Sequence, residues 1–203
     1  MSRDGFSFHF EPRNTAQREF VRCYHENTIT LALGLAGCGK TFLACACALT
    51  DIRNGKAHKL ILIRPVVEAG EKLGYLPGTV ADKLDPFQAP FHHVLSKMAF
   101  KLPKELIESV AVAHLRGMTF ERCVVVVDEC QNLTRTQLRL ILTRIGQGSK
   151  IILCGDPSQT DIGGSDFEDV AEALSDCPGV AVFDFCDEDV VRHPLISEIL
   201  KRV

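Results

Sequence analysis

The chain of 203 residues is long enough for one well-packed domain and too short for two domains of ordinary size. Hydrophobic residues make up 46% and charged residues 24%, a balance that excludes a disordered or fibrous protein. The formal net charge of −3 excludes a global positive field, so any contact with a nucleic acid must be local.

The chain shows no pattern of a targeting or membrane-spanning segment. Arg3, Asp4 and His9 stand where a secretory signal needs an unbroken apolar run. No apolar stretch reaches the roughly 18 residues of a membrane span. The nine cysteines lie mostly in apolar runs without a C-x-x-C pair, which favours buried thiols in a reducing compartment. We therefore expect a cytoplasmic protein without a membrane partner.

Apolar runs alternate with helix-like segments along the chain, which is the pattern of a parallel sheet with crossover helices. Most of the runs are continuously apolar, as are strands covered on both faces. We predict five strands, at residues 29–33, 60–63, 123–127, 151–153 and 180–183. Helices are predicted at residues 41–52, about 80–100, 134–144, 167–175 and from 194 onward.

The predicted elements form one domain, residues 28–203, preceded by a lead of residues 1–27. Between the second and third strands lies an insert of about residues 65–121 that contains several glycines and prolines. Loops of this length in compact domains are usually functional surfaces. No repeat, low-complexity tract or linker divides the chain.

The first predicted strand is followed by GLAGCGKT at residues 34–41, which fits G-x-x-x-x-G-K-[ST] and opens a predicted helix. Glycines let backbone N–H groups turn inward around the β-phosphate, while Lys40 neutralises the β and γ oxygens. The Thr41 hydroxyl is suited to ligate Mg²⁺. The predicted cofactor-binding residues here are Gly34, Leu35, Ala36, Gly37, Cys38, Gly39, Lys40, Thr41 and Phe42.

Carboxylates at the ends of later strands supply the second half of such a site. Asp128 follows the apolar run 123–127, and we predict that it holds Mg²⁺ through water. Glu129 is predicted to polarise the water that attacks the γ-phosphate. Asp156 follows the fourth strand and approaches the same site, which makes Gln159 a candidate sensor of the γ-phosphate.

Missing motifs separate this pattern from other nucleotidases. Neither the N-K-x-D motif of GTPases nor the L-S-G-G-Q run of ABC transporters occurs, so ATP is preferred over GTP. A small-molecule kinase is disfavoured because Glu129, beside Asp128, promotes the hydrolysis that a kinase must suppress.

In content and order these motifs resemble the PhoH-like ATPases, whose cores are similar to the first RecA-like lobe of superfamily 1 helicases. The resemblance covers the chain from about Arg13, and its family-specific blocks are residues 68–78 and 191–195. It implies an α/β, three-layer P-loop NTPase with a RecA-like parallel sheet and helices on both faces. In this sheet the Ile151 strand separates the phosphate strand from the Asp128 strand. The resemblance also implies adenine recognition by Gln17 in the lead.

The family is described as predicted ATPases linked to RNA metabolism and phosphate starvation. The resemblance therefore implies a Mg²⁺-dependent ATPase that works as an oligomer on RNA or single-stranded DNA. The alternative is an ATP-dependent switch that binds a protein partner without helicase activity. The candidate polymer contacts are Arg64, Lys72, His114 and Arg116. Met118 replaces a basic residue usual in the family, which removes one charge from this set.

Superfamily 1 helicases hold ATP between two lobes, and arginines of the second lobe neutralise charge on the γ-phosphate. This chain has the pattern of one lobe, so we expect a homo-oligomeric ring, such as a hexamer. Arg192 is the predicted arginine finger toward a neighbouring subunit, with Arg144 as its rival.

Cys38 stands in the phosphate loop where the family usually has threonine. At a helix N-terminus thiolate is favoured, which predicts a Cys38 whose modification inactivates the enzyme. A packed and inert thiol is the alternative.

Overall fold

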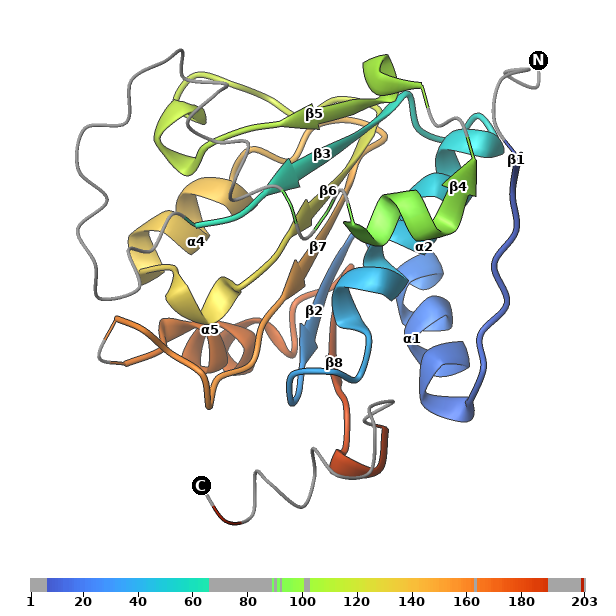
Figure 1. Cartoon of the computed structure of the whole chain (residues 1–203). Coiled ribbons are helices and arrows are strands. Elements are labelled where there is room, and N and C mark those ends of the chain that lie inside the picture. The colour runs from blue at the N-terminus through green and yellow to red at the C-terminus, as the bar shows by residue number, and fades with distance from the viewer. Residues whose placement is uncertain are drawn as a thin grey trace.

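A parallel sheet of six strands forms the centre of the molecule, in the order β5–β3–β6–β7–β2–β8 (Figure 1). The computed structural model describes residues 7–65, 89, 91, 93–100, 103–162, 164–189 and 202. The strands are β2 (Ile29–Leu33), β3 (Lys59–Ile63), β5 (Ile107–Ser109), β6 (Cys123–Val127), β7 (Lys150–Cys154) and β8 (Val180–Asp184). A separate antiparallel pair joins β1 (Ser7–Phe8) to β4 (Ala99–Phe100).

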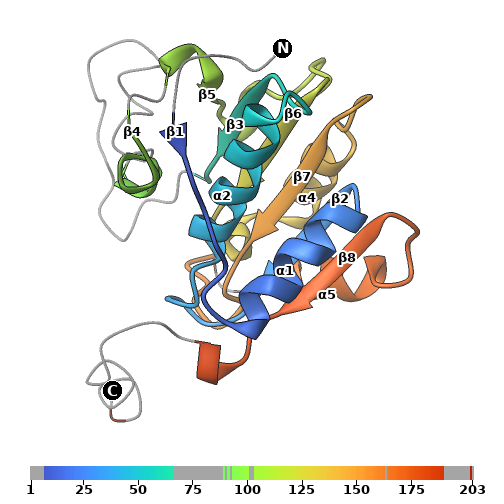
Figure 2. The same cartoon turned by 90° about the vertical axis from the view of Figure 1, so that its right-hand side faces the viewer.

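Helices cover both faces of the sheet (Figure 2). One face carries α1 (Thr15–Glu26) and α2 (Lys40–Arg53), and the other carries α4 (Arg135–Leu142) and α5 (Asp166–Leu174). Short 3₁₀ turns are η1 (Lys104–Leu106), η2 (Val112–His114), η3 (Cys130–Asn132) and η4 (Asp187–Asp189). The three-layer α/β class predicted from the sequence is confirmed.

The strand order also confirms that β7 lies between β2 and β6. Strand β2 leads into the glycine-rich loop of residues 34–41, called the phosphate loop below, and β6 ends before Asp128. The predicted count of five strands is wrong, because β5 in the insert adds a sixth at the edge of the sheet. It pairs with β3 in parallel, Leu60 opposite Ile107. With three partly exposed residues, β5 has too short an apolar run to stand out in the sequence.

Both faces of the central strands are apolar, which explains their continuous apolar runs. Alternate residues belong to two separate clusters: Val124 and Val126 pack on the side of α2, while Val125 and Val127 pack on the side of α4 and α5. The lead contributes to the first cluster through α1, whose Phe20 is fully buried.

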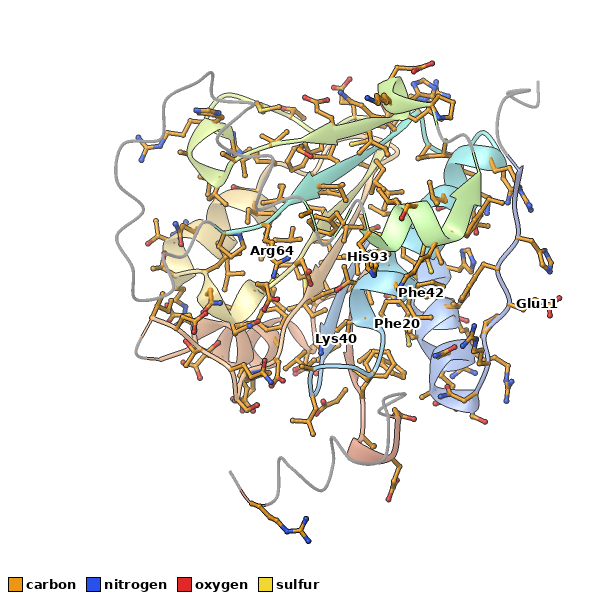
Figure 3. The ribbon with its side chains drawn as sticks, in the orientation of Figure 1. Glu11, Phe20, Lys40, Phe42, Arg64 and His93 are labelled. Atoms are coloured by element: carbon orange, nitrogen blue, oxygen red, sulfur yellow. The ribbon has the colours of Figure 1, made fainter. Side chains whose placement is uncertain are left out.

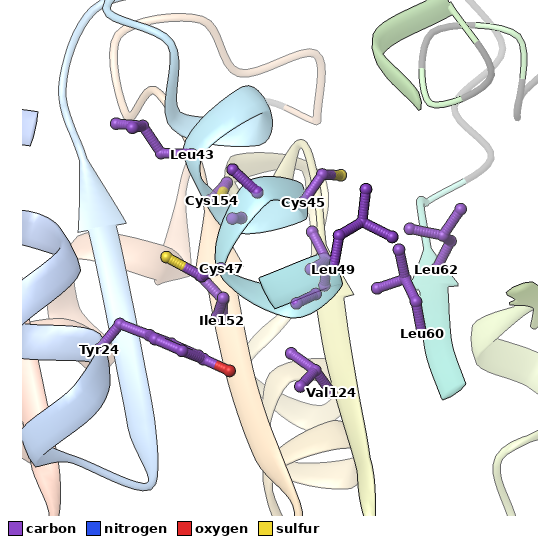
Figure 4. Close-up of a cluster of buried hydrophobic side chains, with 14 of the residues drawn as sticks. Tyr24, Leu43, Cys45, Cys47, Leu49, Leu60, Leu62, Val124, Ile152 and Cys154 are labelled. Carbon is purple, nitrogen blue, oxygen red and sulfur yellow. The ribbon is translucent and has the colours of Figure 1, made fainter. Parts of the chain in front are cut away.

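Helix α2 is deeply enclosed, and every residue from Leu43 to Leu49 is buried. Figure 4 shows this cluster between α1 and the sheet, with Tyr24 on one side and Leu60 and Leu62 on the other. Burying a leucine side chain contributes about 1.5–3 kcal/mol. This packing fixes α2, and with it the position of the loop that precedes its N-terminus.

The remaining predicted helices fall partly outside the described residues. Within the segment predicted as a helix near residues 80–100, residues 89, 91 and 93–98 are helical. The predicted helix from residue 194 lies outside the described residues apart from residue 202. In the described parts of the chain, no helix combines the length and apolarity needed to cross a membrane.

Candidate functional site

The loop between β2 and α2 has a backbone that only glycine adopts readily. Gly34, Gly37 and Gly39 have φ values of 133°, 102° and 90°. A Cβ on Gly34 would also lie 2.8 Å from the Phe185 backbone oxygen. Gly39 is the N-cap of α2 and makes no side-chain cap, so the first amides of this long helix face the loop. Such an arrangement attracts anions.

Lys40 supplies a cation inside this loop. Its side chain folds back so that Nζ donates to the Gly34 oxygen at 2.6 Å and to the Leu35 oxygen at 2.9 Å. The residue is buried, and the Cys38 sulfur lies 3.6 Å from Nζ. Carbonyl dipoles therefore stabilise the ammonium at the position where phosphate oxygens are expected.

Two oxygen ligands meet next to the start of α2. The Thr41 hydroxyl donates to Asp128 Oδ1 at 2.8 Å, across the space between α2 and the end of β6. Burial, and then the neighbouring Glu129, raise the pKa of Asp128, while the hydrogen bond from Thr41 lowers it. A hydroxyl and one carboxylate fit Mg²⁺, which prefers oxygen ligands and takes the remaining ones from phosphate and water.

Glu129 is held by two donors on an unusual backbone. Its φ is 55°, in the left-handed region that few residues other than glycine adopt. Arg64 Nη2 donates to Glu129 Oε1 at 2.8 Å, and Gln131 Nε2 donates to Oε2 at 2.6 Å. Backbones of this kind persist where surrounding contacts fix them, and they cluster at functional sites.

The loop after β7 is connected to both the phosphate loop and Glu129. Asp156 accepts from the Ala36 backbone N–H at 2.7 Å and from the Ser158 hydroxyl at 2.6 Å. Gln131, which is 1% exposed, accepts from the Asp156 N–H at 3.1 Å and donates to the Gln159 carbonyl at 3.2 Å. The Gln159 side chain itself is exposed. Glu129 and Asp156 thus belong to one hydrogen-bonded network at the carboxyl ends of the strands, and Asp128 precedes Glu129 directly in the chain.

Gln17 lies beside the phosphate loop and is 7% exposed, so it is not a solvated residue of α1. Its Oε1 accepts from the Arg13 N–H at 2.8 Å. A cavity of about 390 Å³ opens next to it. Phe10 and Phe42 form an edge-to-face pair with ring centroids 6.0 Å apart. The cavity is lined by Phe8, His9, Phe10, Glu11, Arg13, Gln17, Gly37, Cys38, Gly39, Phe42, Lys97 and Met98.

Arg144 lies far from this network within the same chain. Helix α4 begins after the carboxyl end of β6 and returns toward the amino end of β7. Arg144 therefore lies near the amino ends of the strands, opposite the phosphate loop. Its Nη1 donates to the Met118 oxygen at 3.4 Å, and its buried Nε has no hydrogen-bond partner among the described residues. Arg192 and Lys72 lie outside the described residues.

Cys38 contradicts the expected thiolate. The residue is 1% exposed, and its thiol donates to the Leu35 oxygen at 3.1 Å. Burial raises the pKa of Cys38, although the positive charge of Lys40 acts in the opposite direction. The cost of burying a negative sulfur therefore outweighs the attraction of the helix N-terminus, and the packed, neutral thiol is the better description.

Two residues of the network were not predicted as site residues. Arg64 was assigned to a polymer-contacting surface, but its guanidinium bonds to Glu129. Gln131 received no role, although its place two residues after Glu129 was a visible signal. The contact between Arg64 and Glu129 depends on the pairing of β3 with β6, which no local motif reveals.

Comparisons with known proteins show what this chain is similar to. A family model described as PhoH-like protein matches residues 9–203. The chain is 41% identical over 194 residues to a PhoH-like protein of Synechocystis sp., covering 91% of this chain and 59% of that protein. It is 37% identical to a PhoH-like protein of Bacillus subtilis, covering 93% and 62%, and 35% identical to Protein PhoH of Escherichia coli K12, covering 93% and 56%.

The chain therefore spans 56–62% of the length of these curated relatives. Among solved structures, the large terminase of a thermophilic bacteriophage superposes on 95% of this chain and 50% of its own, with a TM-score of 0.62 and 11% identity. At this low sequence identity, the similarity to the terminase shows the fold alone.

Proposed function

Because the chain belongs to the PhoH-like protein family and has the fold of P-loop ATPases, we propose that it binds ATP with Mg²⁺ and hydrolyses it. The observation that carries the proposal is the 2.8 Å hydrogen bond between Thr41 and Asp128, directly beside the glycine-rich loop and Lys40. In a P-loop enzyme such a pair holds the metal, the hydroxyl directly and the carboxylate, at the end of another strand of the sheet, through water.

The phosphates of ATP would take the place of the loop carbonyls as partners of Lys40. The Lys40 ammonium then neutralises the β and γ oxygens, and the N–H groups at the start of α2 surround the β-phosphate. When bound, Mg²⁺ neutralises charge that develops on the phosphates. Thr41 and Asp128 would hold the ion, and the hydrogen bond that now joins these two side chains would then be broken.

Hydrolysis needs a group that orients water toward the γ-phosphate. Glu129 follows Asp128 directly and carries its carboxylate at the same edge of the sheet. We assign it the role of polarising the water. Gln159 would sense the γ-phosphate from the loop that Asp156 fastens to Ala36.

The adenine is proposed to enter the cavity beside Gln17. Its volume of about 390 Å³ lies in the range of small-molecule sites, and aromatic side chains suit a planar base. The amide of Gln17, oriented through its bond from Arg13, offers a hydrogen bond to the edge of the base.

Paired variants test the proposal. Lys40→Ala should lose both ATP affinity and turnover, because phosphate neutralisation is gone. Glu129→Gln should retain affinity and lose hydrolysis by about 10²-fold or more, the usual size for a positioned general base. ATP binding and phosphate release are measured in parallel, with Lys104→Ala on the exposed η1 turn as the control. Equal loss of nucleotide affinity in Lys40→Ala and Glu129→Gln would contradict the assigned roles.

We further propose that ATP hydrolysis is coupled to RNA or single-stranded DNA in an oligomer. His114 and Arg116 support this, since both are exposed and follow β5 at the same carboxyl edge. Phosphate contacts make binding steeply salt-dependent. The ATPase rate is therefore compared with and without single-stranded RNA or DNA across a salt series, using His114→Ala/Arg116→Ala as the variant. A rate that neither polymer stimulates at any salt concentration would favour a switch that binds a protein partner.

A further inference from the structure

Arg64 reaches Glu129 because their two strands are neighbours. Ile63 pairs with Val127, so the residues that follow β3 and β6 leave the sheet side by side. The Arg64 side chain is 20% exposed and ends in the 2.8 Å ion pair with Glu129. Figure 3 labels Arg64 close to the end of β3 and Lys40 at the start of α2, within the same region of the molecule.

The second terminal nitrogen of Arg64, Nη1, has a different environment from the Nη2 that bonds to Glu129. Arg64 Nη1 is buried and has no hydrogen-bond partner among the described residues. An unpaired buried donor is unfavourable, and the bond from Nη2 to Glu129 offsets part of this cost. Within the described parts of the chain, the charge-assisted bond to Glu129 holds the Arg64 guanidinium in place.

Glu129 in turn needs to be held from outside. Its left-handed backbone is unfavourable for a residue with a Cβ, and a carboxylate at the end of a flexible side chain has many rotamers. Arg64 takes one oxygen and Gln131 takes the other, so the carboxylate is fixed from two sides. The Gln131 side chain is itself hydrogen-bonded to the Asp156 N–H and the Gln159 carbonyl, whereas Arg64 contributes a positive charge beside Glu129.

We propose that Arg64 is a positioning residue for hydrolysis, which acts by fixing the Glu129 carboxylate in the orientation that polarises water. The inference rests on the proposed ATPase function. It assigns Arg64 to the reaction itself and not to a nucleic-acid surface. The effect of Arg64 should therefore appear in the absence of any polymer, in the rate and not in nucleotide affinity.

The test is a double-mutant cycle on the full chain without nucleic acid. Arg64→Ala should lower kcat by about 10- to 100-fold, the size typical of losing a supporting contact to a functional group. ATP affinity should stay within about threefold, since Lys40, Thr41 and Asp128 are unchanged. In the Glu129→Gln background the same substitution should add less than about threefold, because its target is already gone.

Arg64→Lys and Arg139→Ala complete the design. Lysine keeps the charge but not the planar fork, so it should recover part of the kcat lost in Arg64→Ala. Arg139 is exposed on α4, and its replacement should leave kcat unchanged. Thermal unfolding of each variant establishes that it is folded, and Arg64→Lys carries the cycle if Arg64→Ala does not fold.

Each other outcome would overturn the inference. Additive losses in the double variant would mean that Arg64 acts independently of Glu129. A rise of kcat in Arg64→Ala would mean that the arginine restrains the carboxylate. Loss of ATP affinity with unchanged kcat would place Arg64 on the nucleotide. A wild-type chain that does not hydrolyse ATP would instead refute the proposed function, which separates the two failures.

Discussion

Single residues of the site are held by contacts that ligands would have to replace. Lys40 donates to two loop carbonyls and Thr41 donates to Asp128, so contacts within the chain already order the glycine-rich loop. Gln17 is likewise fixed, by the Arg13 backbone. Preorganisation of this kind lowers the ordering cost of binding. Individual substitutions should therefore affect binding and turnover separately.

Gln17→Ala should weaken ATP binding by about 2- to 10-fold, because it removes one or two neutral hydrogen bonds to the base. The preference for ATP over GTP should fall, while kcat at saturation stays close to that of the wild type. Affinities for both nucleotides measure this, with Glu19→Gln on the exposed side of α1 as the control. An unchanged ATP/GTP ratio would remove Gln17 from the base-binding site.

Cys38 should be slow to react with alkylating agents. Because burial raises its pKa, the thiol stays protonated at neutral pH, and its labelling should increase only at pH values above the ordinary range for cysteine. The exposed Cys177 and Cys186 should be labelled first. Peptide mapping by mass spectrometry at about pH 7 and about pH 9.5, below and above the ordinary cysteine pKa, follows the order. Early labelling of Cys38 at neutral pH would restore the reactive thiolate predicted from the sequence.

At the scale of elements, α1 and α2 are joined at the amino edge of the sheet by a buried polar contact. The Tyr24 hydroxyl donates to Asp51 Oδ2 at 2.6 Å, and both residues are buried. Burial and the carboxylate of Asp51 raise the pKa of Tyr24, so the phenol remains a donor at all moderate pH values. Lys150 Nζ lies 4.7 Å from the centroid of the same ring.

Tyr24→Phe should lower the free energy of unfolding by about 1–3 kcal/mol, since it removes a hydrogen bond to a buried charged group. ATP affinity should not change, because the contact is at the edge of the sheet opposite the phosphate loop. Urea unfolding and nucleotide titration on the same variant test both statements. A stability equal to that of the wild type would mean that water replaces the hydroxyl.

Elements could be predicted from the sequence where local patterns specify them. The largely apolar runs of β2 and β6 predicted the sheet and its class, and the GLAGCGKT motif predicted the glycine-rich loop between β2 and α2. Edge strand β5 was not predicted, since its three residues include Glu108 and are only partly buried. The pairing of Arg64 with Glu129 could not be predicted, because 65 positions separate them and only the β3–β6 register brings them together.

At the scale of the whole molecule, the proposed nucleotide would be covered by this chain on one side. In the described parts of the chain, one RecA-like sheet carries the network around Glu129, which approaches the glycine-rich loop from the side of that sheet. In P-loop enzymes an arginine supplied by a neighbour raises the rate by about 10³–10⁵. Arg144, at the opposite edge of the sheet, is too remote to serve the loop of its own chain, so any contact with a γ-phosphate must be made with another subunit.

Subunit mixing tests this arrangement, with Arg192 as the first candidate from the sequence and Arg144 as its rival. If a finger is shared, the specific ATPase activity of the wild type should rise with protein concentration as subunits assemble. Lys40→Ala and the finger variant should each be inactive alone and partly active when mixed, because one contributes an intact arginine and the other an intact phosphate loop. Arg144→Ala and Arg192→Ala are mixed separately with Lys40→Ala, and the one that shows recovery identifies the finger. Arg144 also donates to the Met118 carbonyl within its own subunit, so thermal unfolding must accompany its variant to separate a lost finger from lost stability. A rate per subunit that is independent of concentration, together with full activity of both arginine variants, would mean that each subunit hydrolyses ATP on its own.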